Sequence, residues 1–308
     1  MAFHVLVSDP LAADAVASMR EAGLSVDEKT DLAVDQLIAE IPAYDAIMVR
    51  SATKVRQPII DAASRLKLIV RAGVGLDNVD VEYARTKGIT VRNTPGASSN
   101  SVAELALGHM FSLARHIGRG TVSMKQGGWE KKALKGVEID GKTLGVVGIG
   151  RIGQLLAKKA VALGMNVIAF DAFVEQSPLP GLVAMTDLDT LLAQSDFVSL
   201  HIPFDPERGA TIGAREMAVM KDGAFLVNCA RGGVVDESAL ASALAEGKLA
   251  GAALDVFAKE PPASDDPLFS QATLSLTPHI GASTKEAQAR VGKEAASIVI
   301  EFAHTMSA

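Results

Sequence analysis

Short apolar segments alternate with helical stretches along most of the chain. In the first 95 residues, Leu11–Glu21 and Asp35–Ala39 have the spacing of helices. Strands that alternate with helices of this length form βαβ units, whose strands pair in parallel. The sequence therefore predicts an α/β protein that begins with a doubly wound parallel sheet. The strands expected in this sheet are Val5–Ser8, Leu24–Val26, Ala46–Val49, Leu66–Val70 and Ile89–Val91.

A second series of strands predicts a second parallel sheet. Its expected strands are Leu144–Gly148, Val167–Phe170, Phe197–Leu200, Ala224–Val227, Gly251–Val256 and Leu274–Leu276. Six strands with helices between them are the count of a complete dinucleotide-binding sheet. The chain then ends in one helix from Lys285 to about Phe302, which we expect to pack on the first domain. The expected domains are residues 1–95 with 285–308, and residues 96–284.

The segment that joins the two series reads as one long helix, Ser101–Arg115, with apolar residues on most faces. A helix that is hydrophobic nearly all round is buried, here between domains or subunits. His109 lies on this helix, and we interpret it as a packed histidine rather than a ligand.

Composition narrows the class of protein. The chain has 308 residues, a net charge of −6, one cysteine and no apolar stretch long enough to span a membrane. A single cysteine allows no internal disulfide and no cysteine-based zinc site, and the histidines have no metal-ligand spacing. The N-terminus lacks the basic start of a signal peptide. We expect a cytoplasmic protein that binds no nucleic acid, membrane or metal.

The most informative motif is a glycine pattern between a strand and a helix. Gly148, Gly150 and Gly153 fit G-x-G-x-x-G after an apolar strand, and the helix Gln154–Leu163 follows. In such a motif the first glycine permits a tight turn, the second admits a pyrophosphate, and the third allows close helix packing. The helix N-terminus then offers N–H groups to the phosphates. The alternative is a tight turn without a ligand.

Asp171 ends the strand after this motif, eighteen residues beyond Gly153. A carboxylate at this place accepts hydrogen bonds from the adenine ribose 2′-hydroxyl and repels a 2′-phosphate. The position favours NAD over NADP.

Three further residues follow predicted strands and have suitable chemistry for an active site. They are Arg231, Glu260 and His279. An arginine binds a carboxylate with two hydrogen bonds, and a histidine exchanges protons near neutral pH with a glutamate to stabilise its charged form. The structural alternatives are a helix cap for Arg231, an ordinary loop charge for Glu260 and a turn residue for His279. Cys229, close to Arg231, is interpreted as a small buried residue because no base lies in its segment.

Several stretches of the chain resemble the D-isomer-specific 2-hydroxyacid dehydrogenases. The likeness covers essentially the whole chain, and the segments Asn228–Gly233 and Gly281–Gln288 are most similar to the D-3-phosphoglycerate dehydrogenases of that family. It implies a flavodoxin-like substrate domain and an inserted Rossmann NAD-binding domain. The stretches that carry it are Arg50–Lys54, Arg71–Asn78, Gly148–Gly153, Asn228–Glu237, Ala252–Pro262 and Pro278–Gln288.

The resemblance assigns roles to individual residues. Arg231 would hold the substrate carboxylate, His279 would act as acid and base at the 2-hydroxyl, and Glu260 would bond to His279. The implied NAD-binding residues are Gly148, Gly150, Arg151, Ile152, Gly153, Asp171, Pro203, Cys229, Ala230, Asp255 and Gly281, with Asp255 facing the nicotinamide carboxamide. The implied substrate-binding residues are Arg50, Ser51, Arg71, Val74 and Gly75, with Arg50 and Ser51 at the distal phosphate.

Oxidation of D-3-phosphoglycerate, the start of serine biosynthesis, is the activity that the resemblance favours. Ala52 stands where some phosphoglycerate dehydrogenases have a second arginine, so glyoxylate or hydroxypyruvate reduction and 3-sulfolactate oxidation remain alternatives. An NAD-sensing corepressor is a further alternative, although no peptide-docking groove is recognisable in residues 1–95. The chain stops at Ala308 without the regulatory extension of some relatives, so we expect no serine feedback. The resemblance also implies a homodimer or homotetramer.

Overall fold

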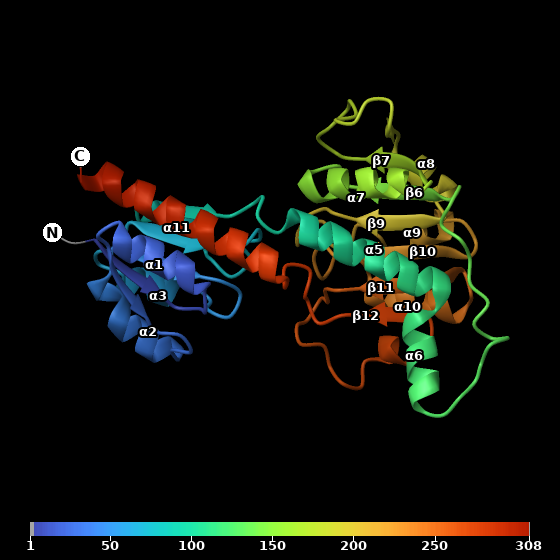
Figure 1. Cartoon of the computed structure of the whole chain (residues 1–308), viewed down its shortest axis with the longest axis horizontal. Helices are drawn as coiled ribbons and strands as arrows, with labels where there is room; N and C mark the ends of the chain where they lie inside the picture. Colours follow the sequence, from blue (N-terminus) through green and yellow to red (C-terminus); the bar gives the residue numbers. More distant parts are fainter. Residues whose placement is uncertain (1–2, 308) are drawn as a thin grey trace. The chain divides into compact units, whose positions relative to one another are not determined.

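The computed structural model describes residues 3–307 and forms two compact units (Figure 1). Unit 1 combines the residues up to Ser98 with those from Ala282 onward, and unit 2 is Ser99–Gly281. Each unit contains one parallel sheet flanked by helices. The predicted fold class, two doubly wound α/β domains, is confirmed.

Unit 1 is built on a five-stranded sheet with the order β2-β1-β3-β4-β5. All its strand pairs are parallel, and the order is that of flavodoxin-like folds. Its strands are β1 (His4–Val7), β2 (Ser25–Glu28), β3 (Ala46–Val49), β4 (Leu68–Arg71) and β5 (Thr90–Asn93). Its helices are α1 (Ala13–Glu21), α2 (Val34–Glu40), η1 (Ile41–Ala43), α3 (Gln57–Ala62), α4 (Val81–Thr86) and α11 (Lys285–Ser307).

Both faces of this sheet are buried, because successive strand residues point to opposite sides. Val5 and Val7 of β1 belong to the core under α1 and α11, whereas Leu6 belongs to the core under α2 and α3. The C-terminal helix α11, red in Figure 1, lies beside α1, blue in the same view. Helices α1 and α11, which are far apart in the sequence, therefore contribute to the same core.

Unit 2 is built on a seven-stranded sheet with the order β12-β11-β10-β9-β6-β7-β8. Read from the other edge, its first six strands have the order of a dinucleotide-binding sheet, and β12 extends it. Its strands are β6 (Thr143–Val147), β7 (Asn166–Phe170), β8 (Ala184–Met185), β9 (Phe197–Leu200), β10 (Ala224–Asn228), β11 (Leu249–Leu254) and β12 (Leu274–Leu276). Its helices are α5 (Ser99–Arg115), α6 (Ile117–Lys125), α7 (Arg151–Ala162), α8 (Leu188–Gln194), α9 (Ala214–Val219), α10 (Glu237–Ala245) and η2 (Pro267–Ser270).

The long helix α5 lies on one face of this sheet beside α7, as Figure 1 shows. Its residues Ala103, Ala106 and Met110 are fully buried against α7 and the sheet. On the opposite face, α8, α9 and α10 contribute a second core. The burial expected for this helix therefore arises within unit 2.

The clearest differences from the sequence prediction are at β8, α6, α7 and α11. The sequence does not predict β8, which has only two residues and is too short for an alternating pattern of apolar and polar residues. The sequence does not predict α6, which contains two glycines and has no buried residue. α7 begins at Arg151 instead of residue 154, because its first turn lies inside the glycine motif, and α11 continues to Ser307. In the described part of the chain, no helix is long and apolar enough to cross a membrane.

Candidate active site

The glycine motif joins β6 to α7, and its three glycines have three different environments. A Cβ on Gly148, where φ is +94°, would lie 2.6 Å from the His201 carbonyl oxygen. A Cβ on Gly153 would lie 2.1 Å from the Gly148 carbonyl oxygen. At Gly150 an added Cβ would meet nothing within 4 Å. The first and third glycines are thus required by packing, and the second leaves open space at the start of a helix, where a pyrophosphate fits.

Asp171 follows β7 and lies beside this loop. Its Oδ2 accepts a hydrogen bond of 2.9 Å from the Ile149 amide, and its Oδ1 accepts one of 2.9 Å from the Phe173 amide. The carboxylate is therefore fixed next to the glycine motif, as its predicted role with the ribose requires. Arg151 and Ile152 form the first turn of α7, with Arg151 exposed and Ile152 half-buried.

Glu260 and His279 are 19 residues apart in sequence and form a direct contact. His279 Nδ1 lies 2.7 Å from Glu260 Oε2, and both side chains are accessible to solvent. Glu260 Oε1 accepts a second hydrogen bond from the Phe257 amide at 3.1 Å. His279 itself has φ of +52°, in the left-handed region, and its amide donates to the Asp255 carbonyl oxygen at 2.8 Å. The pair can hold and release a proton at the free Nε2 of His279.

Arg231 follows β10 at the same carboxyl edge of the sheet. Its Nη1 donates to the Ala230 carbonyl oxygen at 2.6 Å, and its own carbonyl oxygen accepts from Asn228 Nδ2 at 3.0 Å. The next residue, Gly232, packs so closely on the loop after β11 that a Cβ would lie 1.7 Å from the Phe257 carbonyl oxygen. The structure therefore places the Arg231 loop against the loop that leads to Glu260.

Glu237, the first residue of α10, supports that second loop. Its Oε1 accepts from the Ala258 amide at 2.7 Å, and burial raises the pKa of its carboxyl group. Sequence reasoning did not single out this residue, which ends the family-like stretch Asn228–Glu237 without a distinct signal of its own.

The remaining NAD-binding candidates of unit 2 also lie at the carboxyl ends of strands. Asp255 is buried after β11, and its Oδ2 accepts from the Gly281 amide at 2.8 Å. Cys229 and Ala230 are buried directly after β10, and Pro203 is exposed after β9. Burial, followed by the nearby Asp255 charge, raises the pKa of the Cys229 thiol. The thiol is thus protonated at neutral pH, as expected of a core residue rather than a nucleophile.

The substrate-binding candidates belong to unit 1. Arg50 and Ser51 follow β3, and Arg50 Nη1 donates to the Pro10 carbonyl oxygen at 3.3 Å. Arg71 ends β4, and its guanidinium covers Gly73, where an added Cβ would lie 1.6 Å from Arg71 Nη1. Val74 and Gly75 follow in the same loop and are half-buried. All five lie at the carboxyl edge of the unit 1 sheet.

Asp9 is a buried residue of this edge that sequence reasoning missed. Its carboxylate accepts from the Arg50 amide and, at 3.1 Å and 2.7 Å, from the Thr53 amide and hydroxyl. In the sequence, Asp9-Pro10 signalled only the end of a strand. Among the described residues, no group of three or more His, Cys, Asp or Glu side chains is arranged to hold a metal ion.

The chain matches the family "D-isomer specific 2-hydroxyacid dehydrogenase, NAD binding domain" over residues 107–281. It is 52% identical to hydroxypyruvate reductase from Thermotoga maritima over 95% of each chain. It is 47% identical to D-3-phosphoglycerate dehydrogenase from Archaeoglobus fulgidus over 97% of this chain and 57% of that protein. Its structure is similar to that of D-lactate dehydrogenase from Aquifex aeolicus complexed with NAD and lactic acid, with a TM-score of 0.85, 31% identity and coverage of 98% and 96%.

The chain belongs to the D-isomer-specific 2-hydroxyacid dehydrogenase family. It is an NAD-dependent dehydrogenase of that family, and the predictions of enzyme class and cofactor are confirmed. The open face at Gly150 and the carboxylate of Asp171 fit this cofactor.

Proposed function

We propose that this chain oxidises D-3-phosphoglycerate to 3-phosphohydroxypyruvate with NAD, the first step of serine biosynthesis. The observation that carries the proposal is the 2.7 Å contact of His279 with Glu260 at the carboxyl edge of unit 2. The glycine motif follows a strand of the same parallel sheet. The similarity to several D-3-phosphoglycerate dehydrogenases supports the choice of substrate.

His279 is the acid and base of the proposed reaction. Because Glu260 occupies its Nδ1, its Nε2 is the nitrogen that accepts the proton of the substrate 2-hydroxyl. The Glu260 carboxylate stabilises the imidazolium that results. Arg231 binds the substrate carboxylate with its planar guanidinium and so orients C2. NAD would supply the hydride acceptor for C2.

The proposed NAD contacts come from the loops that follow β6, β7, β9, β10, β11 and β12 of unit 2. The amides of Gly150, Arg151 and Ile152 would bind the pyrophosphate at the start of α7, and Asp171 would accept hydrogen bonds from the adenine ribose. Pro203, Cys229 and Ala230 would line the path toward the nicotinamide end. Asp255, next to Gly281, would face the carboxamide.

Unit 1 is the proposed substrate domain. The amides of Val74 and Gly75 are its proposed backbone contacts to the substrate. Arg50, with Ser51, would bind the distal phosphate, and Arg71 is a second cation at the same sheet edge. Arg50 is thus the side chain on which the choice of a phosphorylated substrate mainly rests.

Reduction of hydroxypyruvate is a second candidate, favoured by the 52% identity to the Thermotoga maritima enzyme of that name. Ala52, which stands where some phosphoglycerate dehydrogenases have a second arginine, also favours hydroxypyruvate as the substrate. Hydroxypyruvate and 3-phosphohydroxypyruvate differ only by the phosphate group. Comparing the kcat/KM of the enzyme for these two keto acids therefore tests whether it recognises the phosphate group.

The test is steady-state oxidation of NADH at 340 nm with each keto acid, in wild-type protein, Arg50→Ala and Arg85→Ala. Arg85 is an exposed arginine of α4 paired with Glu82, so its variant controls for loss of a positive charge. We expect kcat/KM to favour 3-phosphohydroxypyruvate. We expect only Arg50→Ala to raise the KM for it, about 10- to 100-fold, as for loss of a charged hydrogen bond. A preference for hydroxypyruvate that Arg50→Ala leaves unchanged would refute the phosphoglycerate proposal and support the second candidate.

We also propose that the protein is a homodimer or a homotetramer of dimers. The support is α6, whose residues are all at least partly exposed although Ile117, Val122 and Met124 are apolar and more than half exposed. Trp129, in the segment that follows, is 78% exposed. A second copy of the chain would cover these side chains. A solution mass equal to one chain, measured by sedimentation, would contradict this.

A further inference from the structure

His109, the buried histidine of α5, has hydrogen-bond partners at both ring nitrogens. Its side chain is 3% exposed, and it faces two alternate residues of β12 and the loop that follows it. Its Nδ1 lies 2.9 Å from Ser275 Oγ, and its Nε2 lies 3.0 Å from Thr277 Oγ1. Buried polar groups are hydrogen-bonded as a rule, and these two contacts fix the orientation of the ring.

The chemistry of the next contact fixes which nitrogen carries the proton. Thr277 Oγ1 donates to Asp255 Oδ1 at 2.6 Å, because the carboxylate can only accept. The single hydroxyl proton of Thr277 is thereby used, so its oxygen accepts from His109, whose Nε2 must carry hydrogen. Burial lowers the pKa of His109, with Asp255 acting in the opposite direction. In the neutral ring, Nδ1 carries no hydrogen and lies 2.9 Å from Ser275 Oγ, whose hydroxyl proton is directed to Ser112 Oγ.

Asp255 connects this chain of hydrogen bonds to the loop that carries His279. Its Oδ1 also accepts from the Ile280 amide at 2.8 Å, and its Oδ2 accepts from the Gly281 amide at 2.8 Å. His279, between these contacts and Thr277, has a left-handed backbone that its surroundings must maintain. The carboxylate of Asp255 is thus the common support of the segment from Thr277 to Gly281.

We propose that His109 is a positioning residue, which orients the Asp255 carboxylate through Thr277 and thereby holds the His279 loop and the nicotinamide end of the NAD site. The last part rests on the proposed function, in which Asp255 faces the nicotinamide carboxamide. The bond from Nε2 to Thr277 is the essential one. The chain of contacts lies entirely within unit 2.

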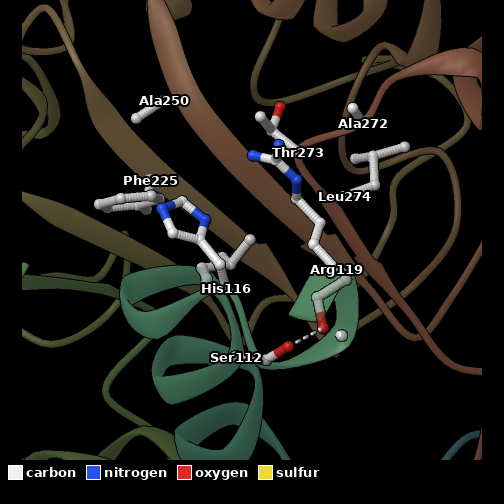
Figure 2. Close-up of a pocket in the computed structure, with 11 residues that line it drawn as sticks. Ser112, His116, Arg119, Phe225, Ala250, Ala272, Thr273 and Leu274 are labelled. Carbon is white, nitrogen blue, oxygen red and sulfur yellow. Dashed lines mark hydrogen bonds between the residues drawn. The ribbon is translucent and has the colours of Figure 1, made fainter. Parts of the chain in front are cut away.

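The contact at Nδ1 is the weaker one, because Ser275 donates its hydroxyl proton to Ser112 Oγ at 3.1 Å. Both serines line a small cavity together with His116 and Arg119, which Figure 2 shows. Water entering there can replace a lost hydroxyl on this side of the ring. No such replacement is expected at Thr277, whose hydroxyl lies between the imidazole and the buried Asp255.

Two amide substitutions separate the two sides of the ring. In His109→Gln, the longer side chain places its amide near the former Nε2 and keeps a donor for Thr277. In His109→Asn, the shorter side chain reaches only the former Nδ1 position and loses that donor. Thr277→Val removes the hydroxyl at nearly constant volume, Thr277→Ser retains it, and Ser112→Ala changes only the cavity side.

The first measurement is amide hydrogen exchange at Ile280 and Gly281 in protein without ligand. We expect about tenfold faster exchange in His109→Asn and Thr277→Val, the effect of losing one hydrogen bond. His109→Gln, Thr277→Ser and Ser112→Ala should remain close to wild type. Equal exchange in His109→Asn and His109→Gln would overturn the proposal, because a packing role does not distinguish the two amides.

The second measurement compares the Kd of NAD with that of ADP-ribose, which lacks nicotinamide. We expect His109→Asn and Thr277→Val to weaken NAD about tenfold and to leave ADP-ribose unchanged. Equal loss for both ligands would refute the link to the nicotinamide end. A wild-type protein that reduces neither keto acid would refute the proposed function instead, and hydrogen exchange would still decide the role of His109.

Discussion

In unit 1 the strand order reverses between β1 and β3, and in unit 2 it reverses between β6 and β9. Open α/β sheets bind ligands at such a switch point, outside the carboxyl ends of the strands. In unit 1 this place is filled by the carboxylate of Asp9, which binds the backbone of Arg50 and Thr53. In unit 2 it holds the glycine loop, with Gly150 facing open space.

The first turns of α1 and α7, the helices that follow the two switch points, differ in their acidic residues. α1 has Asp14 in its first turn, whereas α7 has no acidic residue in its first turn. A helix N-terminus attracts anions only where no side-chain carboxylate already occupies it. Two sheets of similar construction thus differ at their switch points: a carboxylate of the chain itself occupies that of unit 1, whereas the glycine loop leaves that of unit 2 open.

The largest expected effect comes from the reacting group of unit 2. His279→Gln removes the proposed acid and base while retaining a polar side chain of similar size. We expect kcat to fall by about 10²- to 10⁴-fold, with the Kd of NAD unchanged. Steady-state rates at 340 nm and calorimetry measure the two quantities. His304→Gln, at an exposed position of α11, is the control, and a rate unaffected by His279→Gln would mean that the chemistry lies elsewhere.

A second prediction concerns His201, which follows β9 at the switch point of unit 2. Burial lowers the pKa of His201 to about 4, against about 6.5 in an unfolded chain. The unfolded state therefore binds the proton first, and the folded state loses stability as the pH falls from about 6.5 toward 4. Between pH 7 and pH 5 this amounts to about 2 kcal/mol.

Urea unfolding of wild type and His201→Asn at both pH values measures this loss. The variant should depend less on pH than wild type, by about that amount. His304→Gln should retain the wild-type dependence. The same slope in all three proteins would show that the neutral histidine beside Gly148 contributes nothing to the acid sensitivity of unit 2.

A smaller effect is expected at the switch point of unit 1. Asp9→Asn keeps the shape of the side chain but replaces charged hydrogen bonds with neutral ones. We expect the free energy of unfolding to fall by about 1–2 kcal/mol without a change in NAD affinity. Asp14→Asn, at an exposed position of α1, is the matched control. A variant that loses NAD affinity instead would contradict the division of roles between the two units.

The carboxyl-edge loops could be predicted from sequence because they depend on local signals. A strand, a glycine pattern and a helix follow one another at Gly148–Gly153, and strand ends locate Arg231 and His279. The contact of Glu260 with His279 could be expected only from the family resemblance, since 19 residues separate them. Its geometry depends on how the loops after β11 and β12 pack.

The network around His109 could not be read from one helix. The surrounding apolar residues indicate burial, which is correct, but they conceal the polar partners on β12. A signal does exist: Ser275 and Thr277 alternate along the chain and so point to one side, just before His279. Pairing that side with α5 requires the tertiary structure. Asp9 is hidden for the same reason, because its partners are more than 40 residues away.

The most direct test of the contrast between the units is NAD titration of two matched glycine variants. Gly150 and Gly96 both have open space around an added Cβ and need no left-handed backbone, but one lies in unit 2 and the other in unit 1. Both Gly150→Ala and Gly96→Ala should keep the wild-type Tm. We expect calorimetry to give at least a roughly tenfold weaker Kd for NAD in Gly150→Ala and the wild-type value in Gly96→Ala. Equal NAD affinity in the two variants would contradict the assignment of the cofactor to the glycine loop of unit 2.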